Sequence, residues 1–212
     1  MEKPVGMSGS EYYHYKRINN PKRYSPLAKA CKKVTDFQKK GKIKRIIDLG
    51  SSCGSLLKEL EIIYDTKDTF GVDISKYAEK HWCAEGKFIK SDLNYENSDI
   101  LSSVKKIDLI VSFEAAEHLT ELNNLFYVTS LLAHKKSTMI FGAASPLQKS
   151  SKGHVNCKWP SWWRRSFEEN GGWIYDHLAT ARFSYNIGKE NGSGQEVPEY
   201  YLNALVFRKD AI

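Results

Sequence analysis

Two acidic residues and two histidines are the clearest candidates for direct chemistry in this chain of 212 residues. Glu114, Glu117 and His118 are spaced as Glu-x-x-Glu-His, and on a helix these three positions share one face. His154 follows later in the chain and would approach from a different element. A histidine near neutral pH could accept the proton of an attacking hydroxyl. We therefore assign Glu117, His118 and His154 as the candidate catalytic residues.

Two other interpretations of the same four side chains stay open. Two carboxylates and two imidazoles would make a metal site of mixed oxygen and nitrogen ligands. Glu117 and His118 could instead cap and pack the start of a helix. A divalent metal is not favoured over these roles, so we assign no metal ligand.

A second group of residues combines an acid with glycines in one short loop. From Asp48 to Gly54 the chain reads Asp-x-Gly-x-x-x-Gly, with Gly50 as the first glycine. Glycines let the backbone turn sharply and approach a ligand closely. A helix after the loop would direct its N–H groups to the same place. The loop lacks the Gly-x-Gly-x-x-Gly of dinucleotide-binding proteins, and its acid favours a cofactor that carries cationic groups.

The elements that must position these residues alternate between strands and helices. Apolar runs predict strands at 45–49, 69–72, 87–90, 107–112 and 138–142. Periodic apolar positions predict helices at 26–38, 52–64, 75–83, 119–132 and 160–170, with Ser25 as the N-cap of the first and Ser75 opening the third. Such alternation predicts a parallel sheet with helices on both faces. Ligands of these sheets bind beyond the carboxyl ends of the strands.

The C-terminal part predicts a different strand arrangement. Residues 178–185 and 201–207 look like a closing antiparallel pair, separated by a loop rich in glycine and polar residues at 188–198. We therefore expect seven strands in a mostly parallel sheet with a terminal antiparallel strand.

These motifs together resemble those of one enzyme family. The loop from Asp48 to Gly54 resembles the first motif of class I S-adenosylmethionine-dependent methyltransferases. Phe70–Asp73 is similar to the second motif, whose acid holds the ribose hydroxyls, and Asp92 to the residue that binds the adenine amino group. Residues 108–119, reading DLIVSFEAAEHL, are similar to the fourth strand and the turn after it. The resemblance covers roughly residues 25–207 and implies a Rossmann-like α/β fold.

The same resemblance implies a cofactor and the residues that hold it. The cofactor would be S-adenosyl-L-methionine, bound by residues of the matched motifs: Asp48, Gly50, Ser51, Ser52, Gly54, Asp73, Ile74, Asp92, Leu93 and Phe113. Small-RNA 3′-end 2′-O-methyltransferases use a metal set of two glutamates and two histidines. Many class I enzymes that carry Glu-x-x-Glu-His have no known metal.

Positive charge is concentrated at the N-terminus. The net charge is +7, and residues 1–45 hold 13 Lys and Arg against three acids, so the remaining residues carry 7 − 10 = −3. We divide the chain into a basic, Tyr-rich N-terminal segment at 1–24 and a methyltransferase domain at 25–212. The segment could be a lid over the cofactor, an arm for an anionic partner such as nucleic acid, or a solvated stretch.

Composition narrows the cellular setting. The four cysteines include no Cys-x-x-Cys pair, which disfavours a zinc site built on cysteines. Residues 1–10 are polar and do not form the apolar core of a secretory signal, and no apolar run approaches the roughly 20 residues of a membrane span. We expect a cytoplasmic protein with reduced thiols and no membrane partner.

The function expected is methyl transfer to an O or N atom of a small-molecule or sugar-like acceptor, with oxygen slightly preferred. One alternative is a metal-dependent RNA 2′-O-methyltransferase, which the basic N-terminus and the Glu/His set would suit. A second alternative is a non-catalytic scaffold or regulatory subunit with a cofactor fold. The partners expected are a small or anionic substrate, with nucleic acid as the alternative, and no feature indicates an oligomeric state.

Overall fold

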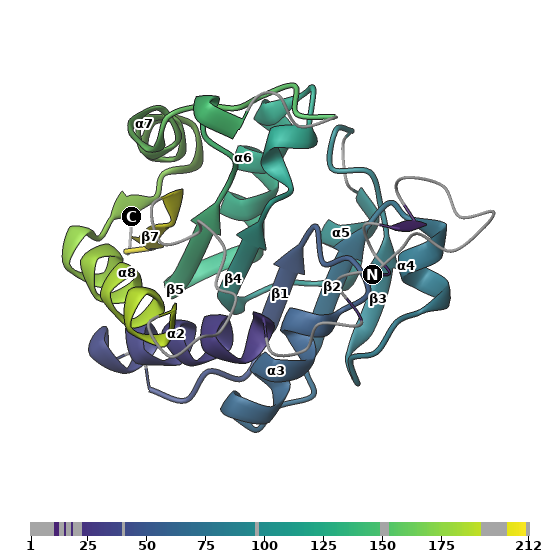
Figure 1. Cartoon of the computed structure of the whole chain (residues 1–212), viewed down its shortest axis with the longest axis horizontal. Helices are drawn as coiled ribbons and strands as arrows, with labels where there is room; N and C mark the ends of the chain where they lie inside the picture. The colour runs from purple at the N-terminus through teal and green to yellow at the C-terminus, as the bar shows by residue number, and fades with distance from the viewer. Residues whose placement is uncertain are drawn as a thin grey trace.

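The fold is built on one mixed sheet. The computed structural model describes residues 23–39, 41–95, 98–148, 153–191 and 203–210, together with Glu11, Tyr12, Tyr15 and Ile18. Its strands are β1 (Ile46–Leu49), β2 (Thr69–Asp73), β3 (Lys87–Lys90), β4 (Ile107–Phe113), β5 (Ala133–Gly142), β6 (Ile174–Tyr175) and β7 (Leu205–Arg208). They form a seven-stranded sheet in the order β3-β2-β1-β4-β5-β7-β6 (Figure 1).

Strand directions match the expected mixed sheet. The strands β3, β2, β1, β4 and β5 are parallel to their neighbours, and β7 is antiparallel to both β5 and β6. In the central register, Asp48 of β1 lies between Gly71 of β2 and Val111 of β4. The carboxyl ends of these three strands therefore meet at one edge of the sheet, where the candidate residues follow them.

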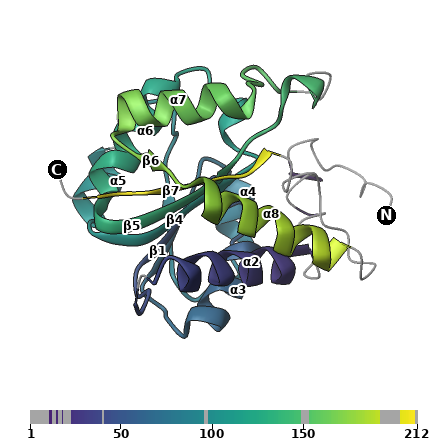
Figure 2. The same ribbon diagram turned by 90° about the vertical axis from the view of Figure 1, so that its left-hand side faces the viewer.

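Helices cover both faces of this sheet. They are α2 (Tyr24–Phe37), α3 (Ser55–Tyr64), α4 (Lys76–Lys80), α5 (Ser98–Ser103), α6 (Leu122–Leu132), α7 (Pro160–Gly171) and α8 (His177–Asn191), with 3₁₀ turns η2 (Ala116–His118) and η3 (Pro146–Gln148). Figure 2 shows α2, α3 and α8 on one face and α5, α6 and α7 on the other. None of the described helices combines the length and apolarity needed to cross a membrane.

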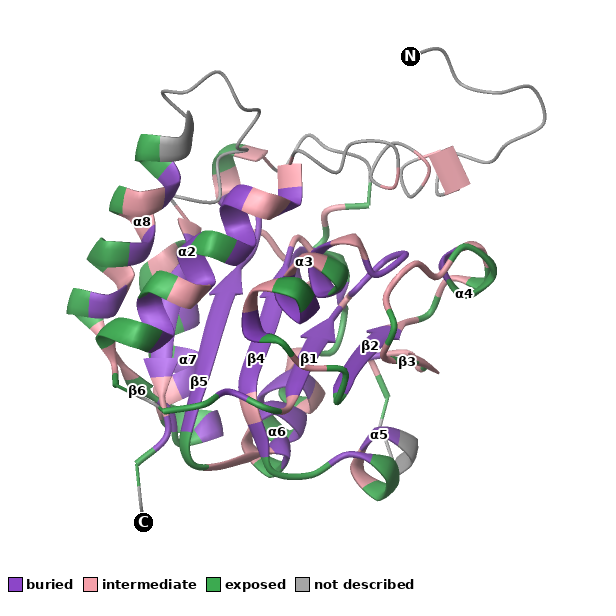
Figure 3. Cartoon of the chain, turned by 90° about the horizontal axis from the view of Figure 1, so that it is seen from below, coloured by how far each residue is buried: buried purple, intermediate pink, exposed green. Residues whose placement is uncertain are grey.

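Each face of the sheet has its own apolar core. On one face, buried side chains of α2, α3 and α8 pack against β1 and β4, and their inward surfaces are the buried ones in Figure 3. On the other face, Phe126, Trp163 and Phe167 pack around Phe141, with ring centroids 4.9 Å apart in three of these pairs. Edge-to-face pairs add about 0.5–1.5 kcal/mol each beyond their buried area. These aromatic contacts stabilise the packing of α6 and α7 against the sheet.

One predicted strand is a helix. Residues 178–185, expected as one half of an antiparallel pair with 201–207, belong to α8. Ala179, Phe183 and Ile187 recur every fourth residue and are fully buried, so the helical period was present beneath the apparent alternation. The expected loop at 188–198 was also wrong in its first part, because residues 188–191 continue α8; its remainder lies outside the described residues. The strand paired with β7 at the outer edge is instead β6.

Helix boundaries differ from expectation in two places near the site. The helix expected from residue 52 begins at Ser55, because Ser52 and Gly54 have φ of +50° and +82°, outside the helical region. The helix expected from residue 119 begins at Leu122 and is preceded by η2. The sequence did not indicate α5.

The expected helix caps had opposite outcomes. Helix α2 begins at Tyr24, so Arg23 is its N-cap and the prediction of Ser25 was wrong. Tyr24 is buried, and its packing extends the helix beyond the expected start. Ser75 caps α4 as predicted, since its Oγ accepts the N–H of Ala78 at 3.2 Å.

Candidate functional site

The loop between β1 and α3 is fixed by its own backbone. The N–H groups of Gly50 and Ser51 both donate to the carbonyl of Val72, at 2.8 and 2.9 Å. Gly50 has φ of +85°, a conformation that side chains disfavour. The loop is therefore tied to the end of β2 before any ligand binds.

Asp73 joins this loop to the next one. Its Oδ2 accepts the N–H of Ser52 at 2.8 Å, and its Oδ1 accepts the N–H of Ser75 at 2.9 Å. A carboxylate offers about four lone-pair positions, so these bonds leave acceptor capacity on both oxygens. Asp73 both orders the loop at the start of α4 and presents a carboxylate at the edge of the sheet.

A small cavity opens beside Asp48. It is lined by Tyr24, Leu27, Asp48, Gly50, Ser51, Ser52, Leu56 and Phe113. Asp48 is only 4% exposed, and a buried carboxylate in such a cavity is suited to a cationic group. Phe113 closes one side and stacks on Phe183 with ring centroids 6.0 Å apart. The structure thus brings four of the five first-motif residues together with Phe113 around this cavity, and the fifth, Gly54, does not line it.

Tyr24 and Leu27 line this cavity although sequence reasoning did not place them in the site. Both lie in the first turn of α2. The sequence signal for Tyr24 is the Tyr-rich segment at 1–24, for which a lid over the cofactor is one interpretation. Leu27 lies outside that segment and has no such signal.

Trp82 is a third residue that sequence reasoning missed. A Cβ on Gly54 would lie 2.8 Å from its indole ring, and one on Gly71 would lie 2.1 Å from it. The Trp82 Nε1–H donates to the carbonyl of Gly86 at 2.9 Å, which fixes the ring. The indole therefore fills the space that glycines leave beside the loop.

The third predicted acid sits at the end of β3. One oxygen of Asp92 accepts both the backbone N–H and the side-chain amide of Asn94, each at 2.9 Å. Asn94 in turn accepts the N–H of Thr120 at 2.7 Å, which links this turn to the segment before α6. Leu93 is buried in the core, whereas Ile74 is 60% exposed beside Asp73.

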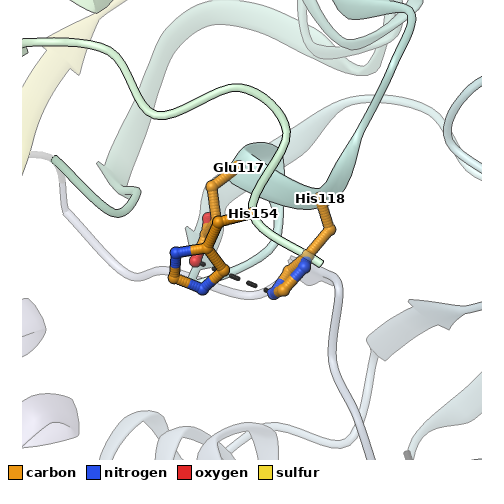
Figure 4. A group of neighbouring side chains, drawn as sticks. All are labelled: Glu117, His118 and His154. Carbon is orange, nitrogen blue, oxygen red and sulfur yellow. Dashed lines mark ion pairs between the residues drawn. The ribbon is translucent and has the colours of Figure 1, made fainter. Parts of the chain in front are cut away.

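The candidate catalytic residues form a separate cluster. Glu117 and His118 lie on η2, directly after β4, and His154 lies on the segment after η3. Each offers one donor atom, and these atoms all lie within 4.8 Å of one another (Figure 4). Glu114 is not part of this group; it sits at a bend with φ of +53°. The helical face expected for Glu114, Glu117 and His118 is therefore replaced by a bend and a 3₁₀ turn.

Ala115 connects this cluster to the cofactor loop. A Cβ built on Gly50 would lie 2.3 Å from the Cβ of Ala115. Since Ala115 immediately precedes η2, the turn that carries Glu117 and His118 is packed directly against the first glycine of the loop. The two groups of candidate residues therefore lie next to each other in the fold.

Comparison with known proteins gives matches by structure. No protein-family model and no curated protein sequence matches the chain. The plantazolicin methyltransferase BpumL in complex with S-adenosylhomocysteine is 14% identical, with a TM-score of 0.67 over 95% of this chain and 90% of that one. The Haloferax volcanii complex of the Trm112 methyltransferase activator with a methyltransferase matches at 12% identity and a TM-score of 0.61, over 96% and 95% of the chains.

A third match is an S-adenosylmethionine-dependent methyltransferase from Clostridium acetobutylicum, at 18% identity and a TM-score of 0.51. It covers 61% of this chain, which spans about half of that protein (53%). The chain has the fold of class I S-adenosylmethionine-dependent methyltransferases. The resemblance expected from the motifs is therefore confirmed at the level of the fold.

Proposed function

We propose that this chain is an S-adenosylmethionine-dependent methyltransferase that acts on an O or N atom of a small-molecule or sugar-like acceptor. The observation that carries the proposal is the pair of carboxylates at the ends of β1 and β2. Asp48 is buried beside the small cavity, and Asp73 is oriented by the N–H groups of Ser52 and Ser75.

The residues present fit this cofactor. The Asp48 carboxylate would pair with the methionine ammonium, a charge that its burial favours. The Asp73 carboxylate would accept the two ribose hydroxyls with its remaining lone pairs. Gly50 would allow the backbone to approach the methionine part. Asp92 and Ile74 would contact the adenine, and the exposed Ile74 side chain would then be covered.

The reaction needs few chemical groups from the protein. The cofactor supplies an activated methyl group and its own leaving group. The chain must hold the acceptor atom in line with the methyl group, and such orientation can lower the activation barrier by up to about 7–11 kcal/mol. The cluster on η2 is suited to receiving the acceptor, because it adjoins the cofactor loop through Ala115. His118 or His154 would take the proton from an acceptor hydroxyl, which favours oxygen over nitrogen.

A small acceptor is preferred to RNA. The RNA alternative depends on the basic segment at 1–24, most of which lies outside the described residues. The cluster, in contrast, is fully described and requires only an acceptor that fits beside η2. If RNA is the acceptor, binding of RNA should weaken with salt and after removal of residues 1–22.

Calorimetric titration with S-adenosylhomocysteine tests the proposal. The wild-type chain should bind one equivalent, and Asp73→Asn should bind roughly 10- to 100-fold more weakly, because a hydrogen bond to a charged group contributes about 1.5–3 kcal/mol. Asp65→Asn is the matched control; it changes an exposed acid after α3 and should leave the affinity unchanged. Failure of the wild-type chain to bind would contradict the proposal.

A further inference from the structure

The cluster of Glu117, His118 and His154 has the ligand types of a metal site, and the fold brings them close together. Glu117 and His118 come from η2, and His154 comes from a segment more than thirty residues further along the chain. One donor atom of each lies within 4.8 Å of the other two (Figure 4). Among the described residues, no other group of three or more acids, histidines or cysteines has ligand atoms this close to one another.

Backbone hydrogen bonds hold the two segments against each other. The carbonyl of Glu117 accepts the N–H groups of both Val155 and Asn156, each at 2.9 Å. The side-chain amide of Asn156 also donates to the carbonyl of Leu119. The two histidines are therefore brought together by the fold and not by chance contact of flexible side chains; their rings meet edge to face with centroids 4.9 Å apart.

The hydrogen bonds of the imidazoles select the nitrogen that faces a ligand. The Nδ1 of His118 lies 2.9 Å from the carbonyl of Gly153, and the Nδ1 of His154 lies 2.9 Å from the carbonyl of Gln148. A carbonyl only accepts, so each Nδ1 carries the proton. In the neutral ring the lone pair is then on Nε2, the arrangement that metal-binding histidines use when a carbonyl orients them.

Charge favours a cation at the same place. The Glu117 side chain is fully buried, and a buried carboxylate attracts a neighbouring cation more strongly than an exposed one because water does not screen it. Its Oε1 lies 4.0 Å from His118 Nε2, so the carboxylate faces the imidazole at slightly more than hydrogen-bonding distance. His118 is 40% exposed, which leaves the cluster open to a ligand on one side.

The distances suit closure around one ion. Ligands bound to one ion at about 2.0–2.2 Å are roughly 3–3.5 Å apart. The present separations are at most 4.8 Å, and the one between Glu117 Oε1 and His118 Nε2 is 4.0 Å, so small side-chain rotations would close them around one ion. We propose that Glu117, His118 and His154 bind a divalent transition-metal cation. Two imidazoles and one carboxylate match the ligand sets of zinc and non-haem iron sites that keep open coordination positions, and they disfavour Mg²⁺ and Ca²⁺.

The role of the cation rests on the proposed methyltransferase function. The open positions would bind oxygen atoms of the acceptor, and a bound hydroxyl would lose its proton to solvent more easily. With the cation bound, this greater acidity of the hydroxyl would replace the imidazole base of the metal-free reaction. Acceptors with two neighbouring oxygens, such as a sugar diol or a catechol, suit such a site. The cation would thus determine which acceptor binds, whereas the cofactor loop would bind the cofactor whether or not the cation is present.

Cobalt titration of the full chain tests the site. Co²⁺ is the probe, since its visible absorption reports nitrogen and oxygen ligands and calorimetry gives the stoichiometry. The chelator-treated wild-type chain should bind one equivalent. His154→Gln and Glu117→Gln should each bind at least about tenfold more weakly and lose the visible bands. His134→Gln is the matched control, because His134 pairs with Asp108 at 2.9 Å on another part of the surface.

Each outcome decides the proposal. The absence of a stoichiometric Co²⁺ site in the wild-type chain, or equal affinity in the wild type and His154→Gln, overturns it. Titration of the same samples with S-adenosylhomocysteine separates this failure from failure of the methyltransferase function and shows that each variant is folded. If Glu117→Gln does not fold, the half-buried His154 decides the question alone.

Discussion

Gly50 and Ala115 are in such close contact that a single methyl group on the glycine would lie 2.3 Å from the alanine Cβ. One residue belongs to the loop proposed to bind the cofactor, and the other immediately precedes the turn that carries Glu117 and His118. The spacing between the cofactor loop and the Glu/His cluster is therefore set by the contact of the Gly50 backbone with the Ala115 methyl group. A substitution at either residue should therefore shift both the cofactor loop and the Glu/His cluster.

Gly50→Ala should destabilise the chain in two ways. Alanine at φ of +85° costs about 1–2 kcal/mol of backbone strain, and the clash with Ala115 adds about 1–3 kcal/mol. Gly41→Ala separates these contributions, because Gly41 has φ of +76° and no atom within 4 Å of its Cβ position. Urea denaturation of both variants should show a larger loss for Gly50→Ala. Equal losses would mean that the contact with Ala115 is not tight.

Trp82→Ala should weaken both stability and cofactor binding. The indole fills the space beside Gly54 and Gly71, so its removal leaves a gap next to the loop. Because Trp82 is only partly buried, we expect a loss of about 2–3 kcal/mol in unfolding free energy, below the 3–5 kcal/mol of a fully buried tryptophan. Affinity for S-adenosylhomocysteine should fall as well. Trp159→Ala removes a half-exposed tryptophan elsewhere and should change neither quantity by much.

Cys31 should make the stability of the chain fall at alkaline pH. Burial raises the pKa of its thiol far above the usual range, and the negative charge of Asp48 adds to the effect. The folded state therefore keeps a proton that the unfolded state loses above a pH of about 8.5. Protons bound preferentially by the folded state reduce stability as pH rises, by about 1.4 kcal/mol per unit.

The comparison of wild type with Cys31→Ala measures this effect. The variant has a constant cost from the lost side chain but no titrating thiol. Urea denaturation at pH 7, 8.5 and 10 should show that the wild type loses stability relative to the variant only above about pH 8.5. A difference that does not change with pH would show that the thiol ionises in the folded chain.

Local sequence pattern was sufficient for most of the sheet. The runs at 45–49 and 69–72 are short and apolar, and parallel strands require such continuous burial. The local pattern failed at α8, because the residues between Ala179, Phe183 and Ile187 give the alternation of apolar and polar positions that is typical of a strand. The buried period of four becomes decisive only when the partner helix α2 is known.

The candidate site was predictable to a different extent in its two parts. The acids and glycines of the cofactor loop are determined by turns within a few residues of each strand, so their spacing is visible in the sequence. The meeting of His154 with Glu117 depends on hydrogen bonds between backbone segments far apart in the chain. Trp82 and Tyr24 reach the site through tertiary packing, and no local pattern identifies such residues.

The two hydrogen bonds to the Glu117 carbonyl hold the His154 segment in place without using the side chain of residue 155. They use the N–H groups of Val155 and Asn156, which every residue except proline possesses. The Val155 side chain is 55% exposed and adjoins His154. This position can therefore change in size and polarity while the histidines stay in place, so libraries at residue 155 are a direct route to new acceptor preferences.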